Sequence, residues 1–158
     1  MREVNSFMNK KTEIRKLTLK DIGTVVEPWY TTSLTAHDFI SADYWKKNKE
    51  KMAIHYLPNS ETYLALLNDK IVGFIAMVEN YLAAIFVNKN NQGKGIGKLL
   101  LEFIQNKRTM IQLRVYEKNT KAVDFYKSQG FVIISKNNDE ATGEIELFLE
   151  WKKGCNDR

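Results

Sequence analysis

Gln92-Gly93-Lys94-Gly95-Ile96-Gly97 is the stretch that decides the fold of this 158-residue chain, because it separates two runs with different hydrophobic periods. Before it, residues 81–87 read YLAAIFV, which is typical of a buried β-strand; after it, residues 98–104 read KLLLEFI, which is typical of an amphipathic helix. A glycine-rich turn that opens a helix leaves several backbone N–H groups without intrahelical partners. Those groups and the positive end of the helix dipole attract an anion, most often phosphate. The stretch therefore predicts a strand, a phosphate-binding turn and a helix.

Two familiar phosphate motifs fail on this turn. The P-loop needs a first glycine where Gln92 stands and Ser or Thr where Leu99 stands. The dinucleotide fingerprint G-x-G-x-x-G needs glycine at the positions of Lys98 or Leu100. The sequence therefore favours a phosphate ligand of another kind.

Outward from the turn, strand-like and helix-like runs alternate unevenly. We expect strands over residues 13–17, 62–67, 71–78, 81–87, 111–116, 131–135 and 145–151. We expect helices from Asp21 to a bend or stop near Pro28, over residues 41–57, from the glycine turn to about Asn106, and from Asn119 to Gly130. Turn signals around residues 137–139 and at Gly143 separate the last two strands. Because strands outnumber crossover helices, this order predicts a mixed sheet covered by helices.

Composition limits the class of protein. The length predicts one domain over residues 1–158, with a core over about 12–152. The net charge of +5 is modest and its basic residues are scattered, so a nucleic-acid partner is not expected. No apolar run approaches the roughly 18 residues of a membrane span, and residues 1–11 lack a signal-peptide core. The single cysteine, Cys155, excludes an internal disulfide, and together these features favour the cytoplasm.

The residues Gln92, Gly95 and Gly97 form a Gln-x-x-Gly-x-Gly pattern that resembles the pyrophosphate-binding signature of the GNAT superfamily of N-acetyltransferases. Residues 119–131, NTKAVDFYKSQGF, resemble that family's next signature, Asn-x-x-Ala-x-x-Phe-Tyr-x-x-x-Gly-Phe. Residues 35–45 further resemble small bacterial single-domain members of the YjaB type. The resemblance implies an α/β (mixed α+β) fold: a mostly antiparallel sheet of about six or seven strands flanked by about four helices, in the order β-α-α-β-β-β-α-β-α-β-β. It also implies acetyl-CoA as the donor of an acetyl group that passes directly to a primary amine.

The same resemblance assigns residues to coenzyme A. Three glycines would let the backbone approach the pyrophosphate, and the N–H groups of the turn would cradle it, with two lysines adding charge. The pantetheine arm would lie along the backbone of the central strand, and Asn119 would cap its helix or bond that arm. The implied cofactor-binding residues are Ile85, Phe86, Val87, Gln92, Gly93, Lys94, Gly95, Ile96, Gly97, Lys98, Asn119 and Tyr126.

Proton transfer would need an acid and a base. Tyr126 matches the family tyrosine that faces the CoA sulfur and acts as general acid, although its spacing also suits a core aromatic residue. Some relatives carry a carboxylate on the central strand, and residues 81–85 carry none. His37 is therefore expected as the general base, with an ordering role on a loop as its alternative. Glu27 and Glu79 are weaker candidates.

The remaining side chains leave several alternatives open. His55 is expected to be solvated, Cys155 is not expected to be a nucleophile, and no metal site is expected. An aromatic group suits either an acceptor cleft or the core of a helix pair: Trp29, Tyr30, Phe39, Tyr44 and Trp45.

Three functions compete. The first is an acetyl-CoA-dependent N-acetyltransferase acting on a primary amine of a small molecule or peptide. The second is a non-catalytic acyl-CoA-binding module or sensor, which the missing strand carboxylate motivates. The third is a nucleic-acid-binding domain, which the scattered charge opposes. Both a monomer and a homodimer fit the sequence, which identifies neither the amine nor the range of acyl groups.

Overall fold

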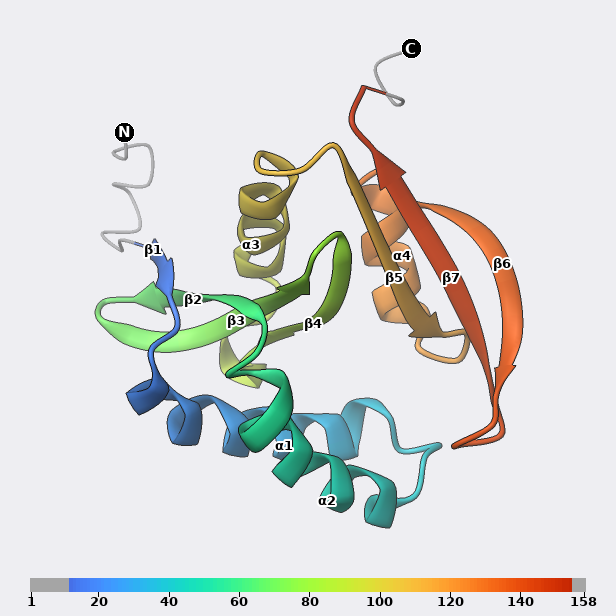
Figure 1. Cartoon of the computed structure of the whole chain (residues 1–158), viewed down its shortest axis with the longest axis horizontal. Coiled ribbons are helices and arrows are strands. Elements are labelled where there is room, and N and C mark those ends of the chain that lie inside the picture. The colour runs from blue at the N-terminus through green and yellow to red at the C-terminus, as the bar shows by residue number, and fades with distance from the viewer. Residues whose placement is uncertain (1–11, 155–158) are drawn as a thin grey trace.

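A computed structural model describes residues 12–154, and within them the chain forms one seven-stranded sheet in the order β1-β2-β3-β4-β5-β7-β6 (Figure 1). The strands are β1 (Thr12–Lys16), β2 (Glu61–Leu67), β3 (Lys70–Val78), β4 (Tyr81–Val87), β5 (Met110–Tyr116), β6 (Val132–Asp139) and β7 (Glu144–Lys152). The helices are α1 (Ile22–Ala36), α2 (Ala42–Lys51), α3 (Ile96–Gln105) and α4 (Thr120–Ser128). Every strand pair is antiparallel except β4–β5, which is parallel. The predicted fold class and element order are confirmed, whereas the single domain stays a prediction.

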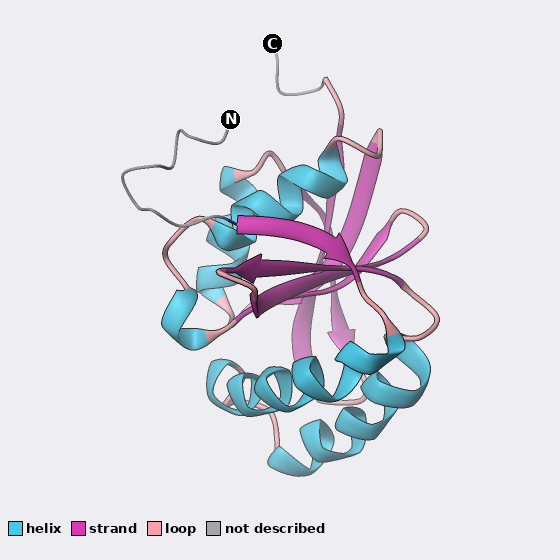
Figure 2. Ribbon diagram, turned by 90° about the vertical axis from the view of Figure 1, so that its left-hand side faces the viewer, coloured by secondary structure: helices cyan, strands magenta, loops and turns pink. Residues whose placement is uncertain are grey.

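Helices cover both faces of the sheet (Figure 2). On one face, α3 and α4 bury a large apolar core, in which Leu100 and Ile104 of α3 are fully enclosed. On the other face, α1 and the π-helical segment Met52–Tyr56 that continues α2 bury a second core around Phe74 and Phe86. Burial of these side chains removes apolar surface from water, which is the main force that holds the helices against the sheet.

The two middle strands of the sheet part from each other. β4 and β5 are paired only at Tyr81 and Gln112, where the Gln112 N–H also donates to the Asn80 carbonyl at 2.8 Å. Beyond that point β4 stays paired with β3 and β5 with β7, so the two halves of the sheet diverge. A register shift in β4 at Ala83 distorts the same strand. The β4 edge that faces β5 is consequently left without a strand partner in the described part of the chain.

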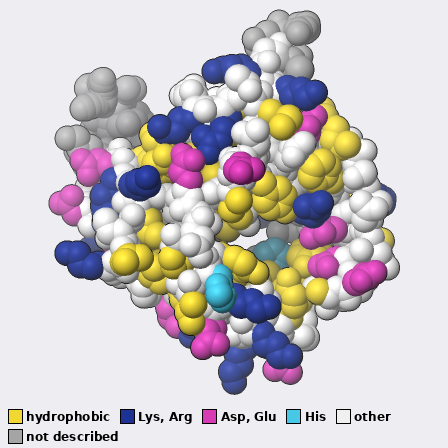
Figure 3. All heavy atoms as spheres, viewed as in Figure 1, with side chains coloured by type: hydrophobic (Ala, Val, Ile, Leu, Met, Phe, Trp, Pro, Cys, Tyr) yellow, Lys and Arg dark blue, Asp and Glu magenta, His cyan; other side chains and the backbone are white. Residues whose placement is uncertain are grey.

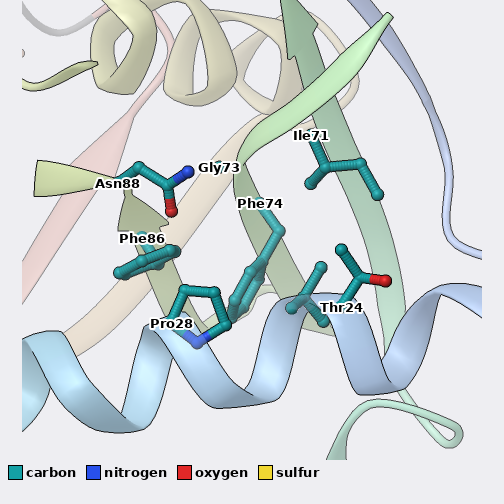
Figure 4. A pocket seen from close by; sticks show the side chains of 8 residues that line it. Thr24, Pro28, Ile71, Gly73, Phe74, Phe86 and Asn88 are labelled. Atoms are coloured by element: carbon teal, nitrogen blue, oxygen red, sulfur yellow. The ribbon is translucent and has the colours of Figure 1, made fainter. Parts of the chain in front are cut away.

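The alternative that α1 stops near Pro28 is wrong, because α1 continues to Ala36, whereas a bend at Pro28 stays a prediction. Pro28 lacks an N–H and leaves the carbonyl four residues earlier without its helical donor. Its ring lies beside Phe74 and Phe86 at a small gap between α1 and the sheet (Figure 4). Packing of the apolar face of α1 on β3 therefore outweighs the lost hydrogen bond.

The turn expected at residues 137–139 is also misplaced. β6 runs through Asn137 and Asn138 to Asp139, which pairs with Glu144. The reversal falls on residues 140–143, where the Asp139 carboxylate accepts the Ala141 N–H at 3.1 Å and Gly143 has a φ of 77°. Pairing with β7 holds the asparagines extended despite their preference for turns. No helix in residues 12–154 is both long and apolar enough to cross a bilayer.

Candidate active site

The glycine turn presents a row of backbone donors. Gly93 and Gly95 have φ angles of 79° and 85°, a region that side chains with a Cβ rarely adopt. The N–H groups of residues 93–98 have no acceptor among the described residues. Because α3 begins at Ile96, these donors stand at the positive end of its dipole. Lys94 and Lys98 are exposed beside them, so the turn has the geometry of an anion site.

Gln92 holds this turn to the end of β4. Its Nε2 donates to the Val87 carbonyl at 2.9 Å. Gly97 differs from the other two glycines, because a Cβ there would meet the Phe125 ring at 3.6 Å, which is ordinary contact. The backbone itself thus favours glycine at positions 93 and 95, and a need for glycine at 97 stays a prediction about the ligand.

The central strand presents backbone rather than side chains to the gap. Ile85 and Val87 pack toward the α3 and α4 core, whereas Phe86 is buried on the α1 side. Their main-chain groups along the β4 edge toward β5 have no strand partner among residues 12–154. An extended ligand arm can pair with such an edge as an added strand.

Tyr126 lies in α4 and is 7% exposed, packed between the rings of Phe125 and Phe131. Its hydroxyl makes no hydrogen bond with the described residues. Burial, with a smaller contribution from Tyr81, raises the pKa of Tyr126 above its ordinary value. The phenol therefore stays protonated at neutral pH and retains a proton that it can donate.

His37 and Asn119 meet although they are far apart in sequence. The Asn119 Nδ2 lies 3.1 Å from the His37 Nε2, and the Asn119 Oδ1 accepts the Ala122 N–H at 3.2 Å as the N-cap of α4. The His37 ring stacks on Trp45, with centroids 5.0 Å apart. Burial lowers the pKa of His37, partly opposed by the Ser33 carbonyl, so the ring is neutral at pH 7. Its basic lone pair already accepts a hydrogen bond from Asn119.

Aromatic rings gather around this pair. Trp45 contacts Trp29 and Tyr44 edge to face, and Phe39 contacts Tyr116 in the same way. The Lys49 ammonium lies over the ring of Tyr30, 4.8 Å from its centroid. In the space-filling view the protein is hollowed above α1 and α2, and hydrophobic side chains surround the opening (Figure 3). Four of the five aromatic residues that the sequence grouped, Trp29, Phe39, Tyr44 and Trp45, therefore lie around His37, and their role at an acceptor cleft stays a prediction.

A polar group on the β5–β7 half of the sheet has no signature in the sequence. Tyr116 of β5 stands opposite Glu146 of β7, and its hydroxyl donates to the Asp139 carboxylate at 2.7 Å. Burial and the nearby Asp139 raise the pKa of Glu146, opposed by Arg114. The hydroxyl of Tyr44 in α2 interacts with the same group. Only the β5–β7 register brings these residues together, and no local motif signals it.

The weaker candidates lie elsewhere. Glu27 forms an exposed ion pair with Lys49 at 2.6 Å, and Glu79 occupies the exposed turn between β3 and β4. His55 is exposed on the π-helical segment, and Cys155 lies outside the described residues.

Comparisons with known proteins agree on one family. Residues 31–145 match the family model described as an acetyltransferase (GNAT) domain. The peptidyl-lysine N-acetyltransferase YiaC of Escherichia coli K12 is 33% identical over 139 residues, which cover 87% of this chain and 95% of that protein. The solution structure of apo-form YjaB from Escherichia coli superimposes with a TM-score of 0.79 at 26% identity, covering 89% of this chain and 97% of that one. The PaiA N-acetyltransferase of Thermoplasma acidophilum, solved with coenzyme A, shares the fold with a TM-score of 0.74 at 21% identity, covering 90% and 99%.

Proposed function

The chain belongs to the GNAT acetyltransferases, and from that premise we propose that it moves the acetyl group of acetyl-CoA to the side-chain amine of a lysine in a peptide or protein. The family expected from residues 92–97 and 119–131 is confirmed, as are N-acetyltransferase activity and acetyl-CoA as the donor. The lysine acceptor and the roles of single residues are proposals, and the oligomeric state stays a prediction.

The parting of β4 from β5 carries the proposal. It leaves a strand edge that ends in a turn whose N–H groups have no acceptor among residues 12–154, as a donor with an extended arm and a pyrophosphate requires. Acetyl-CoA, when bound, supplies an activated thioester. Tyr126 would hold the proton that the departing sulfur takes up, a role that its match to the family motif supports. Burial keeps the phenol protonated, but the raised pKa also makes it a weaker proton donor than an ordinary tyrosine.

The other wall of the gap suits a cationic acceptor. Glu146 and Asp139 offer carboxylates, and Tyr116 and Tyr44 offer ring faces and hydroxyls close to them. A lysine ammonium is attracted to carboxylates and to aromatic faces. The name of the relative YiaC points to the same acceptor.

The general base stays open to test. His37 was expected in that role, but its lone pair is directed at Asn119, so it can take up a proton only after that hydrogen bond opens. A cytoplasmic location and a choice between monomer and homodimer likewise stay predictions.

The test is a thiol-release assay with acetyl-CoA across a panel of amines. We expect lysine-containing peptides to give the highest kcat/KM, above N-terminal peptide amines, amino acids, polyamines and aminoglycosides. A higher value for polyamines would replace the lysine acceptor by a small-molecule one. Tight CoA binding without turnover on any amine would instead support the acyl-CoA sensor, the alternative raised by the absence of a carboxylate on β4.

A further inference from the structure

Asn119 makes two contacts with different parts of the fold through one amide group. Its Oδ1 is committed to the first turn of α4, where it accepts the Ala122 N–H. The amide nitrogen must therefore be the atom that faces the His37 Nε2 at 3.1 Å. An amide NH₂ only donates hydrogen bonds, so the Nε2 of His37 is the unprotonated nitrogen and Nδ1 carries the hydrogen.

The surroundings of the imidazole leave Asn119 as its main polar partner. The His37 Nδ1 is buried, and although the Ser33 carbonyl lies close enough to raise the pKa of the ring, Nδ1 makes no hydrogen bond of ordinary geometry with the described residues. Trp45 stacks on the ring, and Phe39 and Tyr116 meet it edge-on. These contacts fix the plane of the ring and aim Nε2 at Asn119.

The Nδ2 of Asn119 carries two hydrogens, and His37 accepts one of them. The second has no acceptor among residues 12–154. Asn119 is also a residue that the family resemblance assigns to the pantetheine arm of the donor.

We propose that His37 is a positioning residue, whose unprotonated Nε2 orients the Asn119 amide so that its second N–H is held ready for acetyl-CoA. This role rests on the proposed function and differs from that of a general base. Protonated His37 carries a hydrogen on each nitrogen and can no longer accept a hydrogen bond from Asn119. The affinity of the protein for acetyl-CoA therefore falls when the imidazole becomes charged.

Charged neighbours do not mask this titration. Tyr116 stays protonated, since burial and its bond to Asp139 raise its pKa, and Tyr44 has a raised pKa as well. Asp139 accepts the hydrogen bond of the Tyr116 hydroxyl, and the Lys118 ammonium lies over the ring of Phe39. Asp38, next in the chain, is exposed.

Two substitutions separate positioning from base catalysis. In His37→Gln, the amide oxygen can accept from Asn119 but has no basicity, whereas His37→Phe keeps the aromatic stacking and loses the acceptor. We expect the dissociation constant of CoA, measured by calorimetry at pH 7.5, to rise about threefold to tenfold in His37→Phe and to stay near that of the wild type in His37→Gln. Asn119→Ala should weaken binding at least as much, and adding His37→Phe to it should have little further effect.

Acid pH provides the second measurement. We expect the affinity of the wild type for CoA to fall as pH drops below the ordinary histidine pKa near 6.5. The fall should be larger than in His37→Gln, because that variant lacks the imidazole and responds only to the titration of CoA itself. Equal affinity in His37→Phe and wild type would overturn the proposal. So would an equal loss of kcat in both variants with unchanged CoA binding, which is the signature of a base.

Nitrogen NMR of the wild type tests the geometry without any substitution. His55 is exposed and serves as the internal reference for His37. The expected spectrum shows His37 as the Nδ1–H tautomer, and an Nε2–H tautomer would refute the contact. A wild-type protein that binds no CoA would contradict the proposed function. The affinities of the His37 variants and the tautomer seen by NMR test only the role of His37.

Discussion

The two walls of the gap between β4 and β5 are built in different ways. Most of the proposed donor wall comes from one continuous segment, residues 81–105, and would work through backbone groups, namely the β4 edge and the N–H groups of the glycine turn. Asn119 and Tyr126 would add side chains from the region of α4. The proposed acceptor wall comes from α2, β5, β6 and β7 and would work through side chains such as Tyr44, Tyr116 and Glu146. In the proposed function, donor binding therefore depends largely on local backbone conformation, whereas acceptor binding depends on how distant elements pack.

The largest effect is expected on kcat when Tyr126 is changed, because Tyr126 is the proposed proton donor of the reaction. Tyr126→Phe removes the proposed proton donor and keeps the ring that fills the core, so kcat should fall about 100-fold while CoA affinity is unchanged. Tyr63→Phe is the matched control, because Tyr63 lies on β2 and bonds Glu61 at 2.6 Å. Initial rates and calorimetry check both. Unchanged turnover in Tyr126→Phe would remove the acid role.

A substitution in the donor wall should weaken CoA binding through backbone strain. Gly95→Ala places a Cβ at a φ of 85°, which costs about 1–2 kcal/mol or turns the N–H groups away, so the dissociation constant of CoA should rise about tenfold. In Gly23→Ala the new Cβ meets open space, and affinity should not change. Similar affinity in the two variants would show that the turn does not hold the cofactor.

A substitution in the acceptor wall should change KM for the acceptor rather than the affinity for CoA. Glu146→Gln removes a carboxylate, so KM for a lysine peptide should rise about threefold to tenfold while CoA affinity is kept. Glu150→Gln, on the same face of β7, keeps its bond to Gln112 and should leave KM unchanged. A rise in KM that Glu150→Gln reproduces would indicate a general effect of charge.

The same variant tests the electrostatics of this wall. Burial raises the pKa of Glu146 in the folded state, so its ionised form opposes folding at neutral pH. Glu146→Gln should therefore have a higher Tm than the wild type at pH 7. The difference should vanish below about pH 4.3, where the carboxyl is protonated in both the folded and unfolded states. An equal Tm at pH 7 would contradict this.

The smallest effect on activity is expected where α1 begins, because the change there affects stability rather than the proposed site. Asp21 accepts hydrogen bonds from Arg15 at 2.9 and 3.1 Å and from the Thr18 N–H at 2.8 Å, and these hold the pKa of its carboxyl far below the usual range. Asp21→Asn should cost about 1–2 kcal/mol of unfolding free energy at pH 7. The cost should shrink as pH falls below about 3.9, because protonation removes the same advantage from the wild type. Chemical unfolding measures it, with the exposed Asp124→Asn as control.

The sequence by itself determined the donor wall and the order of the elements. Glycines at 93 and 95 mark a backbone that other residues rarely adopt, and hydrophobic periods mark the strand and helix on either side, so local chemistry was sufficient. It failed at Pro28 and at Asn137–Asp139, where packing on β3 and pairing with β7 outweigh local preference. Only the tertiary structure decided that Asn119 meets His37 and that Glu146 stands opposite Tyr116. Both contacts join segments far apart in the chain, and their geometry follows from strand register and helix packing rather than from any local pattern.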